Sequence, residues 1–174
     1  MLEDFLKAIR GCKIHFDFYT LLFFILKYDI NDYRKDLNYM QNIASFYEKT
    51  KNALPHKNTK KFVEMNNKNG NATDLGCGAG RDTIFLIKNN WNVIAIDKED
   101  TQNLIEANLN AEELKKLKFL RQNFEEIHLE KSDLIVSNFS IPFCSKNYFD
   151  DFWVKVVNSI NSNRIFCGKF FWNK

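Results

Sequence analysis

The stretch that decides the fold is Asn71-Ala72-Thr73-Asp74-Leu75-Gly76-Cys77-Gly78-Ala79-Gly80, a short run that ends in an acid and continues into three alternating glycines. The pattern predicts a buried strand that enters a tight turn and leads into a helix. Because glycine has no Cβ, such a turn lets the backbone approach a ligand closely, and the helix that follows offers free N–H groups. The spacing is G-x-G-x-G, whereas the dinucleotide fingerprint is G-x-G-x-x-G. The stretch therefore predicts a site for a nucleotide-like ligand other than a dinucleotide.

Asp97 ends a second apolar run, Val93-Ile94-Ala95-Ile96, and is followed by Lys98. A carboxylate in this place can accept hydrogen bonds from both hydroxyls of a ribose. Either feature alone would also fit an ordinary turn or a solvated strand end. Together, in this order and spacing, they resemble the cofactor half of the class I S-adenosylmethionine-dependent methyltransferases. The resemblance implies that Asp97 and Lys98 lie at the ribose, and that the amino-acid portion of the cofactor faces Asp74, Gly76, Cys77, Gly78, Ala79 and Gly80.

The composition describes one packed domain with a mild positive charge. At 174 residues the chain can bury a sizeable core, and its 45% hydrophobic content, with 17 Phe, excludes a disordered chain. The net charge is +3 and the lysines are interspersed with acids, which does not favour nucleic acid as a partner. The cysteines form no C-x-x-C pair, so we expect neither a metal site nor a disulfide framework, and a reducing cytoplasm suits the chain. They are Cys12, Cys77, Cys144 and Cys167.

The segment Ile14 to Ile30 is the one candidate for a membrane or export signal. Its continuous apolar part, Phe18 to Leu26, is interrupted only by Thr20. A bilayer-spanning helix needs about 20 apolar residues, so this run is too short. Signal peptides begin with positive charge, whereas this chain opens with acids. We therefore expect a buried strand or helix here and no membrane association.

The chain divides into a Phe-rich N-terminal extension, residues 1–39, and a domain over residues 40–174 that carries the motifs above. From Gly70 onward, strand and helix patterns alternate. This alternation predicts an α/β fold, a three-layer, Rossmann-like and mostly parallel sheet with right-handed crossovers. The expected strands are 72–75, 93–96, 118–122, 134–137 and 164–171, and the expected helices are 82–90, 101–109 and 148–160. In such a sheet ligands bind at the carboxyl ends of the strands.

Two further strand ends bear on the site. The third gives Asn123 and Phe124, where an amide oxygen can accept from the amine of adenine and an aromatic ring can cover the base, although a turn Asn and a core Phe fit as well. The fourth gives Ser137-Asn138-Phe139-Ser140-Ile141-Pro142-Phe143-Cys144. It lacks the Asn/Asp-Pro-Pro-aromatic tetrad of the amino-group methylases of DNA. Phe143 separates Pro142 from Cys144, so we expect a buried, inert cysteine rather than a nucleophile.

The sequences of these motifs resemble those of the small bacterial methyltransferases grouped with the tellurite-resistance proteins. Asp74 to Thr83 and Asn138 to Cys144 carry the resemblance, and Ser45 to Thr50 with Pro55-His56 resembles the segment that such enzymes fold over the cofactor. The resemblance covers about Met40 to Phe171. It implies S-adenosyl-L-methionine as cofactor, with Asn138 in the cofactor site. A small-molecule acceptor is expected beside Tyr47, His56, Pro142 and Phe143.

Two features leave alternatives open. The family continues after its fifth strand with a helix and an antiparallel strand pair, whereas this chain ends at Lys174. We expect either a sheet incomplete at that edge or an N-terminal extension that fills it. Methyl transfer to a soft acceptor needs no general base, so the sequence identifies no catalytic residue. The rival functions are a catalytically silent binding module of this fold and an NAD-dependent oxidoreductase, whose glycine motif is absent; the oligomeric state cannot be read.

Overall fold

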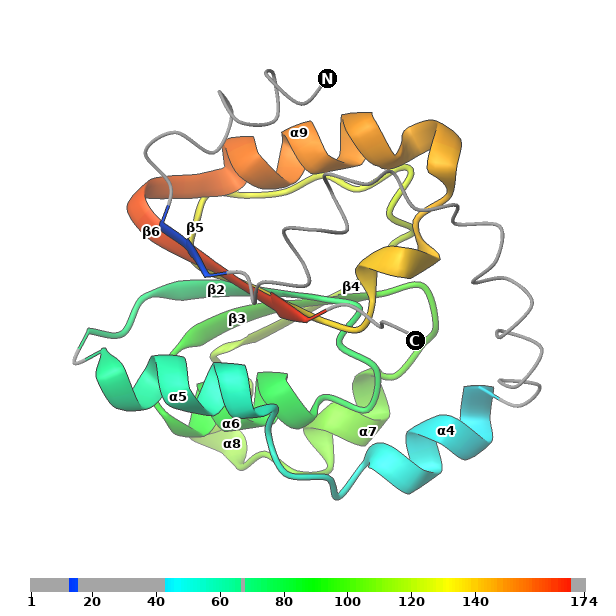
Figure 1. Ribbon diagram of the computed structural model, residues 1–174. Helices are drawn as coiled ribbons and strands as arrows, with labels where there is room; N and C mark the ends of the chain where they lie inside the picture. The colour runs from blue at the N-terminus through cyan, green and yellow to red at the C-terminus, as the bar shows by residue number, and fades with distance from the viewer. Residues whose placement is uncertain (1–12, 16–42, 67, 170–174) are drawn as a thin grey trace.

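The protein is a three-layer α/β sandwich in which helices cover both faces of a parallel sheet (Figure 1). The computed structural model describes residues 13–15, 43–66 and 68–169. The sheet has six strands in the order β1-β6-β5-β2-β3-β4. They are β1 Lys13–His15, β2 Asn71–Leu75, β3 Asn92–Asp97, β4 Leu117–Arg121, β5 Ser132–Asn138 and β6 Ile160–Lys169. Every neighbouring pair is parallel, so the predicted fold class is confirmed.

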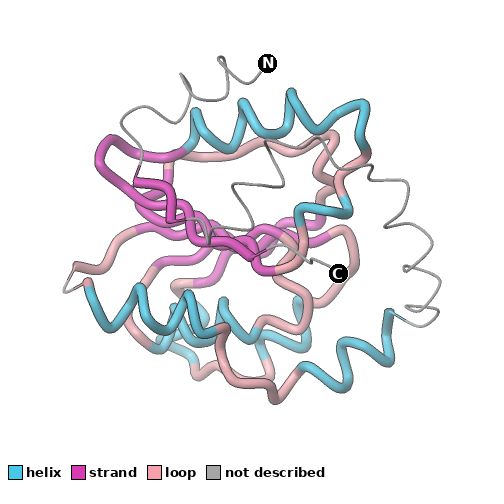
Figure 2. Tube along the Cα trace, viewed as in Figure 1, coloured by secondary structure: helices cyan, strands magenta, loops and turns pink. Residues whose placement is uncertain are grey.

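The helices divide between the two faces of the sheet, as the tube in Figure 2 also shows. On one side lie α5 Lys57–Met65, α6 Arg81–Lys88, α7 Gln102–Glu106 and α8 Ala111–Leu114. On the other side lies α9 Phe149–Ser159. Before α5 comes α4 Ile43–Thr50, and two short 3₁₀ turns, η2 Ile141–Phe143 and η3 Lys146–Tyr148, join β5 to α9.

Most predicted elements lie within a few residues of the observed ones, but the predicted helix over 101–109 is wrong in its extent. The chain forms α7 and then a separate short helix, α8. The break has a local cause, because Asn110 caps the N-terminus of α8. Its side-chain oxygen accepts the N–H groups of Glu112 and Glu113 at 3.0 Å, and the Glu113 carboxylate accepts the Asn110 N–H at 2.9 Å. This reciprocal capping box starts a short helix beyond the end of the predicted one, where we expected no helix.

The edge of the sheet beside β6 is occupied by β1, which comes from the N-terminal extension. Lys13, Ile14 and His15 pair in parallel with Ile165, Phe166 and Cys167. A strand of the extension thus lies where the family's antiparallel pair was expected. The apolar stretch Phe18 to Leu26 lies outside the described residues.

Alternate residues of the strands β2 to β6 contribute to two different cores, as the period-two pattern of a sheet covered on both faces requires. On β5, Leu134 and Val136 pack with α6 and its flanking Trp91, whereas Ile135 packs with α9. The site lies where this stacking stops, at the carboxyl ends of the strands. The chain order reverses between β2 and β5, since β3 and β4 extend the sheet to one side and β6 to the other. Parallel sheets of this kind bind ligands at that reversal point.

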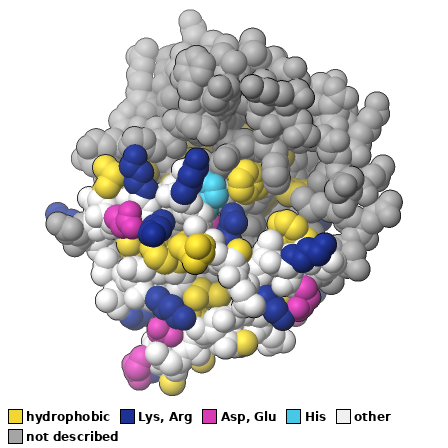
Figure 3. All heavy atoms as spheres, turned by 60° about the horizontal axis from the view of Figure 1, so that its bottom comes forward, with side chains coloured by type: hydrophobic (Ala, Val, Ile, Leu, Met, Phe, Trp, Pro, Cys, Tyr) yellow, Lys and Arg dark blue, Asp and Glu magenta, His cyan; other side chains and the backbone are white. Residues whose placement is uncertain are grey.

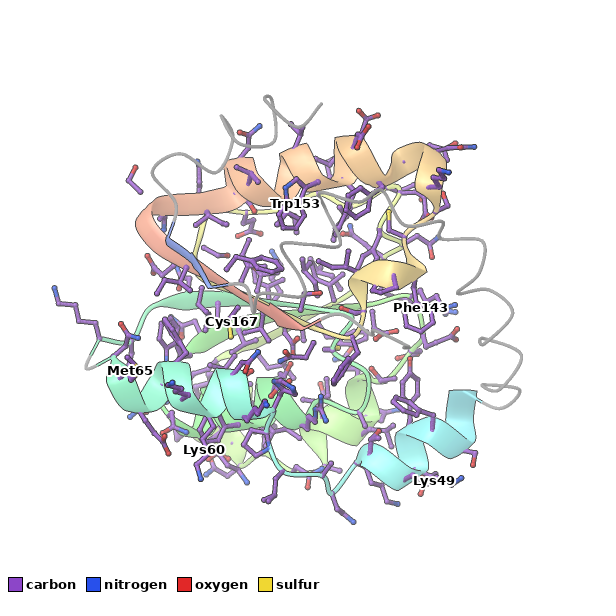
Figure 4. All side chains as sticks on the ribbon, viewed as in Figure 1. Lys49, Lys60, Met65, Phe143, Trp153 and Cys167 are labelled. Atoms are coloured by element: carbon purple, nitrogen blue, oxygen red, sulfur yellow. The ribbon has the colours of Figure 1, made fainter. Side chains whose placement is uncertain are left out.

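Aromatic side chains pack between α9 and the sheet, so substitutions there test the arrangement of this helix. Phe152 is 1% exposed and stacks on Phe124, with ring centroids 4.9 Å apart. Trp153 points from α9 toward the sheet, as Figure 4 shows, and its ring meets that of Phe166 edge-on. Val154, on the same helix, is 52% exposed.

We predict that Phe152→Ala lowers the free energy of unfolding by about 3–5 kcal/mol, because it leaves a cavity where a buried ring stacks on another. Val154 lies on the exposed side of α9, so Val154→Ala should change the free energy of unfolding by no more than about 0.5 kcal/mol. Urea unfolding followed by circular dichroism measures both. Equal losses in the two variants would contradict the arrangement of α9.

Candidate functional site

The loop between β2 and α6 adopts a conformation that only its glycines allow. Gly76, Gly78 and Gly80 have φ angles of +70°, +53° and +83°. A Cβ on Gly76 would lie 2.2 Å from Cβ of Ser140, and one on Gly80 would lie 2.5 Å from Cγ1 of Ile105. The N–H groups of Gly76 and Cys77 both donate to the carbonyl of Ile96, at 2.8 and 3.0 Å. The loop is thereby fixed against the end of β3.

Asp97 ends β3 and is the centre of a second set of contacts. Its Oδ2 accepts the N–H of Gly78 at 2.8 Å, and its Oδ1 accepts the N–H of Glu99 at 3.0 Å. The hydroxyl of Tyr47, from α4, donates to Oδ1 at 3.2 Å. Burial, and then the negative charge of Asp97, raises the pKa of Tyr47, so the hydroxyl keeps its proton and can donate. The side chain of Asp97 is itself buried.

These elements enclose a cavity of about 370 Å³ at the carboxyl ends of the strands. It contains most of the predicted cofactor residues together with Tyr47 and Phe143. The lining residues are Phe46, Tyr47, Thr50, Asp74, Gly76, Cys77, Gly78, Ala79, Arg81, Asp82, Asp97, Lys98, Gln122, Asn123, Phe124, Glu125, Asn138, Phe139, Ser140 and Phe143. Three predicted residues, Gly80, His56 and Pro142, are not among them. The cavity is within the size range typical of small-molecule sites.

Two buried carboxylates, Asp74 and Asp82, lie at the base of the cavity beside the N-terminus of α6. Oδ2 of Asp74 accepts the hydroxyl of Thr83 at 2.7 Å. Burial raises the pKa of Asp74 to about 7, the negative charge of Asp82 adds to this, and the hydrogen bond from Thr83 opposes it. The raised pKa favours the protonated form of Asp74 in the folded protein.

Asp82 is the residue that sequence reasoning missed most clearly. Its Oδ1 accepts the backbone N–H of His56 at 2.7 Å, and its Oδ2 accepts Nδ2 of Asn138 at 3.0 Å. Nε of Arg81 lies 3.6 Å from Oδ2. The signal was an acid in the first turn of a helix that follows a glycine loop. The local sequence reads equally well as a favourable charge at a helix N-terminus, so its long-range partners could not be inferred.

His56 has a structural position rather than a place in the cavity wall. It precedes α5, and its Nδ1 accepts the N–H of Asn58 at 3.2 Å, which caps the helix. Its ring meets that of Phe139 edge-on, with centroids 5.4 Å apart. Pro142 lies in η2 and is half-buried. Gly80 precedes α6 and supplies the turn that starts it.

The end of β5 forms the opposite wall of the cavity. Phe139 follows Asn138 with a φ of +70°, which turns the chain sharply away from the sheet. The hydroxyl of Ser140 donates to the carbonyl of Leu75 and so ties this wall to the glycine loop. Phe143 is 36% exposed and lies at the end of the sheet nearest α4, as Figure 4 shows. Cys144 is buried, and burial raises its pKa to about 12, which fits an inert thiol.

The third strand end contributes a mixed polar and aromatic edge. Phe124 is buried, while Asn123 is exposed at the cavity. Between β4 and Asn123, Gln122 also lines the cavity, and its Oε1 is buried without a hydrogen-bond partner among the described residues. Glu125 accepts the N–H of Ser145 at 3.1 Å. Burial would raise the pKa of Glu125, but hydrogen bonds from its own backbone and from Ser145 outweigh this and lower it.

Other chemistry finds little support in the described part of the chain. No group of three or more histidine, cysteine or acidic residues comes together there as a metal site. No helix in residues 43–66 or 68–169 has the length and hydrophobicity needed to cross a membrane. On the face that Figure 3 shows, Lys and Arg side chains lie scattered among hydrophobic and acidic ones.

Solved structures of methyltransferases share this fold at low sequence identity. The 1,6-didemethyltoxoflavin-N1-methyltransferase of Burkholderia thailandensis, crystallised with its substrate and S-adenosylhomocysteine, matches with a TM-score of 0.57 and 16% identity over 77% of this chain and 60% of its own. The glycopeptide N-methyltransferase MtfA with sinefungin gives 0.57 and 16% over 66% and 49%, and with S-adenosylmethionine 0.53 and 14% over 63% and 52%. The chain spans less than two thirds of each of these proteins.

The fold thus defines the class, an S-adenosylmethionine-dependent methyltransferase fold of class I. The family follows from the sequence. The profile described as "Tellurite resistance protein TehB" matches residues 35–162, which is well over half of the chain. The chain belongs to this family. No curated protein matches it.

Because the pKa of Asp74 is raised in the folded protein, we expect the free energy of unfolding to depend on pH. An unfolded Asp loses its proton at about pH 3.9, whereas the folded protein keeps it to about pH 7. Between these values the folded state binds more protons, so the free energy of unfolding should fall as the pH rises, by at most about 1.4 kcal/mol per pH unit. Asp74→Asn should flatten this slope, and the exposed Asp100→Asn should not. Urea unfolding at about pH 5 and about pH 8 tests it; identical slopes in the parent and Asp74→Asn would contradict the assignment.

Proposed function

We propose that the protein transfers a methyl group from S-adenosyl-L-methionine to a small molecule. The observation that carries the proposal is the glycine loop held against Asp97 at the mouth of a cavity of suitable size. Gly76 and Gly78 line the cavity with backbone alone, which fits a ligand whose atoms approach the backbone closely. Membership of the TehB family and the methyltransferase fold agree with it.

The lining residues divide the cavity into parts that suit the parts of this cofactor. Asp97 lies where it can accept the hydroxyls of a ribose, with Lys98 beside it. Phe124 and the polar side chains of Gln122 and Asn123 form an edge suited to adenine, whose face is aromatic and whose rim carries an amine. The carboxyl group of Asp74 suits the ammonium group of the amino-acid portion, and the charge of nearby Asp82 adds to the negative field there.

Methyl transfer asks the protein chiefly for position and exclusion of water. S-adenosylmethionine supplies a methyl group already activated on a sulfonium. The lining side chains that remain for the acceptor are three phenylalanines and five polar residues: Phe46, Phe139, Phe143, Thr50, Arg81, Glu125, Asn138 and Ser140. The aromatic part of this wall suits a small nucleophile held away from water, and no histidine is among the described residues that line the cavity. Tyr47, which we propose beside the acceptor, lines the same cavity and donates a hydrogen bond to Asp97.

Asp97 should be the most sensitive single position for cofactor affinity. Asp97→Ala removes two charge-assisted hydrogen bonds to a ribose, each contributing about 1.5–3 kcal/mol, so affinity for S-adenosylmethionine should fall at least about tenfold. Asp100→Ala, exposed and three residues away, should leave affinity unchanged. Calorimetric titration measures both. Unchanged affinity in Asp97→Ala would exclude the ribose assignment, and comparable binding of NADH by the parent chain would favour a dinucleotide enzyme.

The acceptor is tested by a panel of candidates with methyl-labelled S-adenosylmethionine. The small size of the cavity and the three phenylalanines in its wall predict transfer to small thiols or chalcogen oxyanions before any transfer to DNA, RNA or protein. Strong labelling of a nucleic acid would overturn a small-molecule acceptor. Tight cofactor binding with no labelling of any acceptor would favour the alternative, a catalytically silent binding module of the same fold.

A further inference from the structure

Asp82 connects three segments that are far apart in the sequence. It lies in the first turn of α6, accepts the backbone N–H of His56 from the segment before α5, and accepts Nδ2 of Asn138 from the end of β5. The same Nδ2 donates to Oγ1 of Thr59 in α5 at 3.0 Å. Asp82 and Thr59 are 4% and 0% exposed, so these bonds are shielded from water. Such shielded, charge-assisted bonds constrain geometry strongly.

The network fixes which way the amide of Asn138 faces. Because both acceptors, Thr59 and Asp82, lie on its Nδ2 side, the opposite orientation would set its oxygen against the carboxylate of Asp82. The oxygen Oδ1 then remains buried and without a hydrogen-bond partner among the described residues. Asn138 and Asp82 both line the cavity, so the network sets the orientation of one cavity wall.

The network also fixes the segment that covers the cavity, residues 43–66, which we call the cover. The cover is held at two places by carboxylates of the cavity. Near its start, Tyr47 donates to Asp97, and near its middle the N–H of His56 donates to Asp82. Figure 1 shows α4 and α5 joined by a short loop between these two points. Since Phe46, Tyr47 and Thr50 line the cavity, the placement of the cover decides its shape.

We propose that Asp82 is a positioning residue that holds the cover and Asn138 in the arrangement that binds the cofactor, and so sets its affinity. The inference rests on the proposed function, since S-adenosylmethionine is the ligand. Asp82 acts through its two partners: the His56 amide, which places the cover, and the Asn138 amide, which places the wall. A substitution that reverses donor and acceptor at Asp82 should therefore be repaired by the opposite reversal at Asn138.

The experiment is this exchange of partners in the full chain. Asp82→Asn sets one amide donor against another, and Asn138→Asp sets one carboxylate against another, so each single variant should bind S-adenosylmethionine about tenfold or more weakly in calorimetric titration. The double variant Asp82→Asn/Asn138→Asp restores one donor and one acceptor and should recover to within about threefold of the parent chain. A double variant no tighter than the weaker single one, or single variants as tight as the parent, would overturn the inference.

The chain offers a matched control at the amino ends of the strands, opposite the cavity. Asp133 likewise accepts a backbone N–H, from Asn71 at 3.0 Å, and a side-chain Nδ2, from Asn161 at 3.0 Å. The exchange Asp133→Asn/Asn161→Asp and its single variants should alter thermal stability but not cofactor affinity. Reduced affinity in these variants would show that general stability, not position, is responsible, and would overturn the inference.

A measurement without ligand separates this inference from the proposed function. In amide exchange followed by nuclear magnetic resonance, Asp82→Ala should speed exchange at His56 about tenfold, because that N–H loses its acceptor. Asn71 serves as the reference amide and should be unchanged. Unchanged exchange at His56 would overturn the positioning role. A parent chain that does not bind S-adenosylmethionine would instead overturn the proposed function, while faster exchange at His56 would still support Asp82 as the anchor of the cover.

Discussion

The hydrogen bond from the Gly78 amide to the Asp97 carboxylate is the contact on which the rest of the site depends. This bond, 2.8 Å long, joins the loop after β2 to the end of the neighbouring strand β3. Beside it, the N–H groups of Gly76 and Cys77 donate to the carbonyl of Ile96. All three loop glycines have positive φ angles. A Cβ on Gly76 or Gly80 would collide with the side chain of Ser140 or Ile105, so the packing around the loop excludes larger residues there. Gly76 and Gly78 therefore line the cavity with backbone alone.

The parallel sheet brings the carboxyl ends of several strands together around that contact. Because all strands run the same way, Asp74, Asp97 and Asn138 come from different strands yet meet around one cavity. Helices on both faces leave the carboxyl edge as the place where polar groups can converge without disturbing either core. The cover closes this edge through bonds to two carboxylates, Asp97 and Asp82. The acids of the cavity thus hold the protein's own cover as well as suiting a cationic ligand.

The sequence predicts the sheet and the glycine loop after β2 well because both depend on local patterns. Apolar runs bounded by glycine and acid mark β2 and β3, and the glycine spacing marks the loop between β2 and α6. The capping box at Asn110, which ends one helix and starts another, was readable in principle as Asn followed three residues later by Glu. The predicted helices follow the apolar pattern alone, which does not indicate this capping box.

What the sequence could not supply are pairings across long separations. The bond between Tyr47 and Asp97 spans 50 positions, and the bond between Asp82 and Asn138 spans 56. Nothing in the local sequence of either partner indicates the other. The contact between Tyr47 and Asp97 and the register of β1 against β6 are pairings of this kind.

The measurement that tests the account most directly is a crystal structure of the full chain with S-adenosylhomocysteine. The account predicts that the ligand lies in the cavity at the carboxyl ends of β2 and β3, with its ribose on Asp97 and its amino group toward Asp74 and Asp82. A ligand bound outside this cavity, or bound there with its ribose away from Asp97, would contradict it.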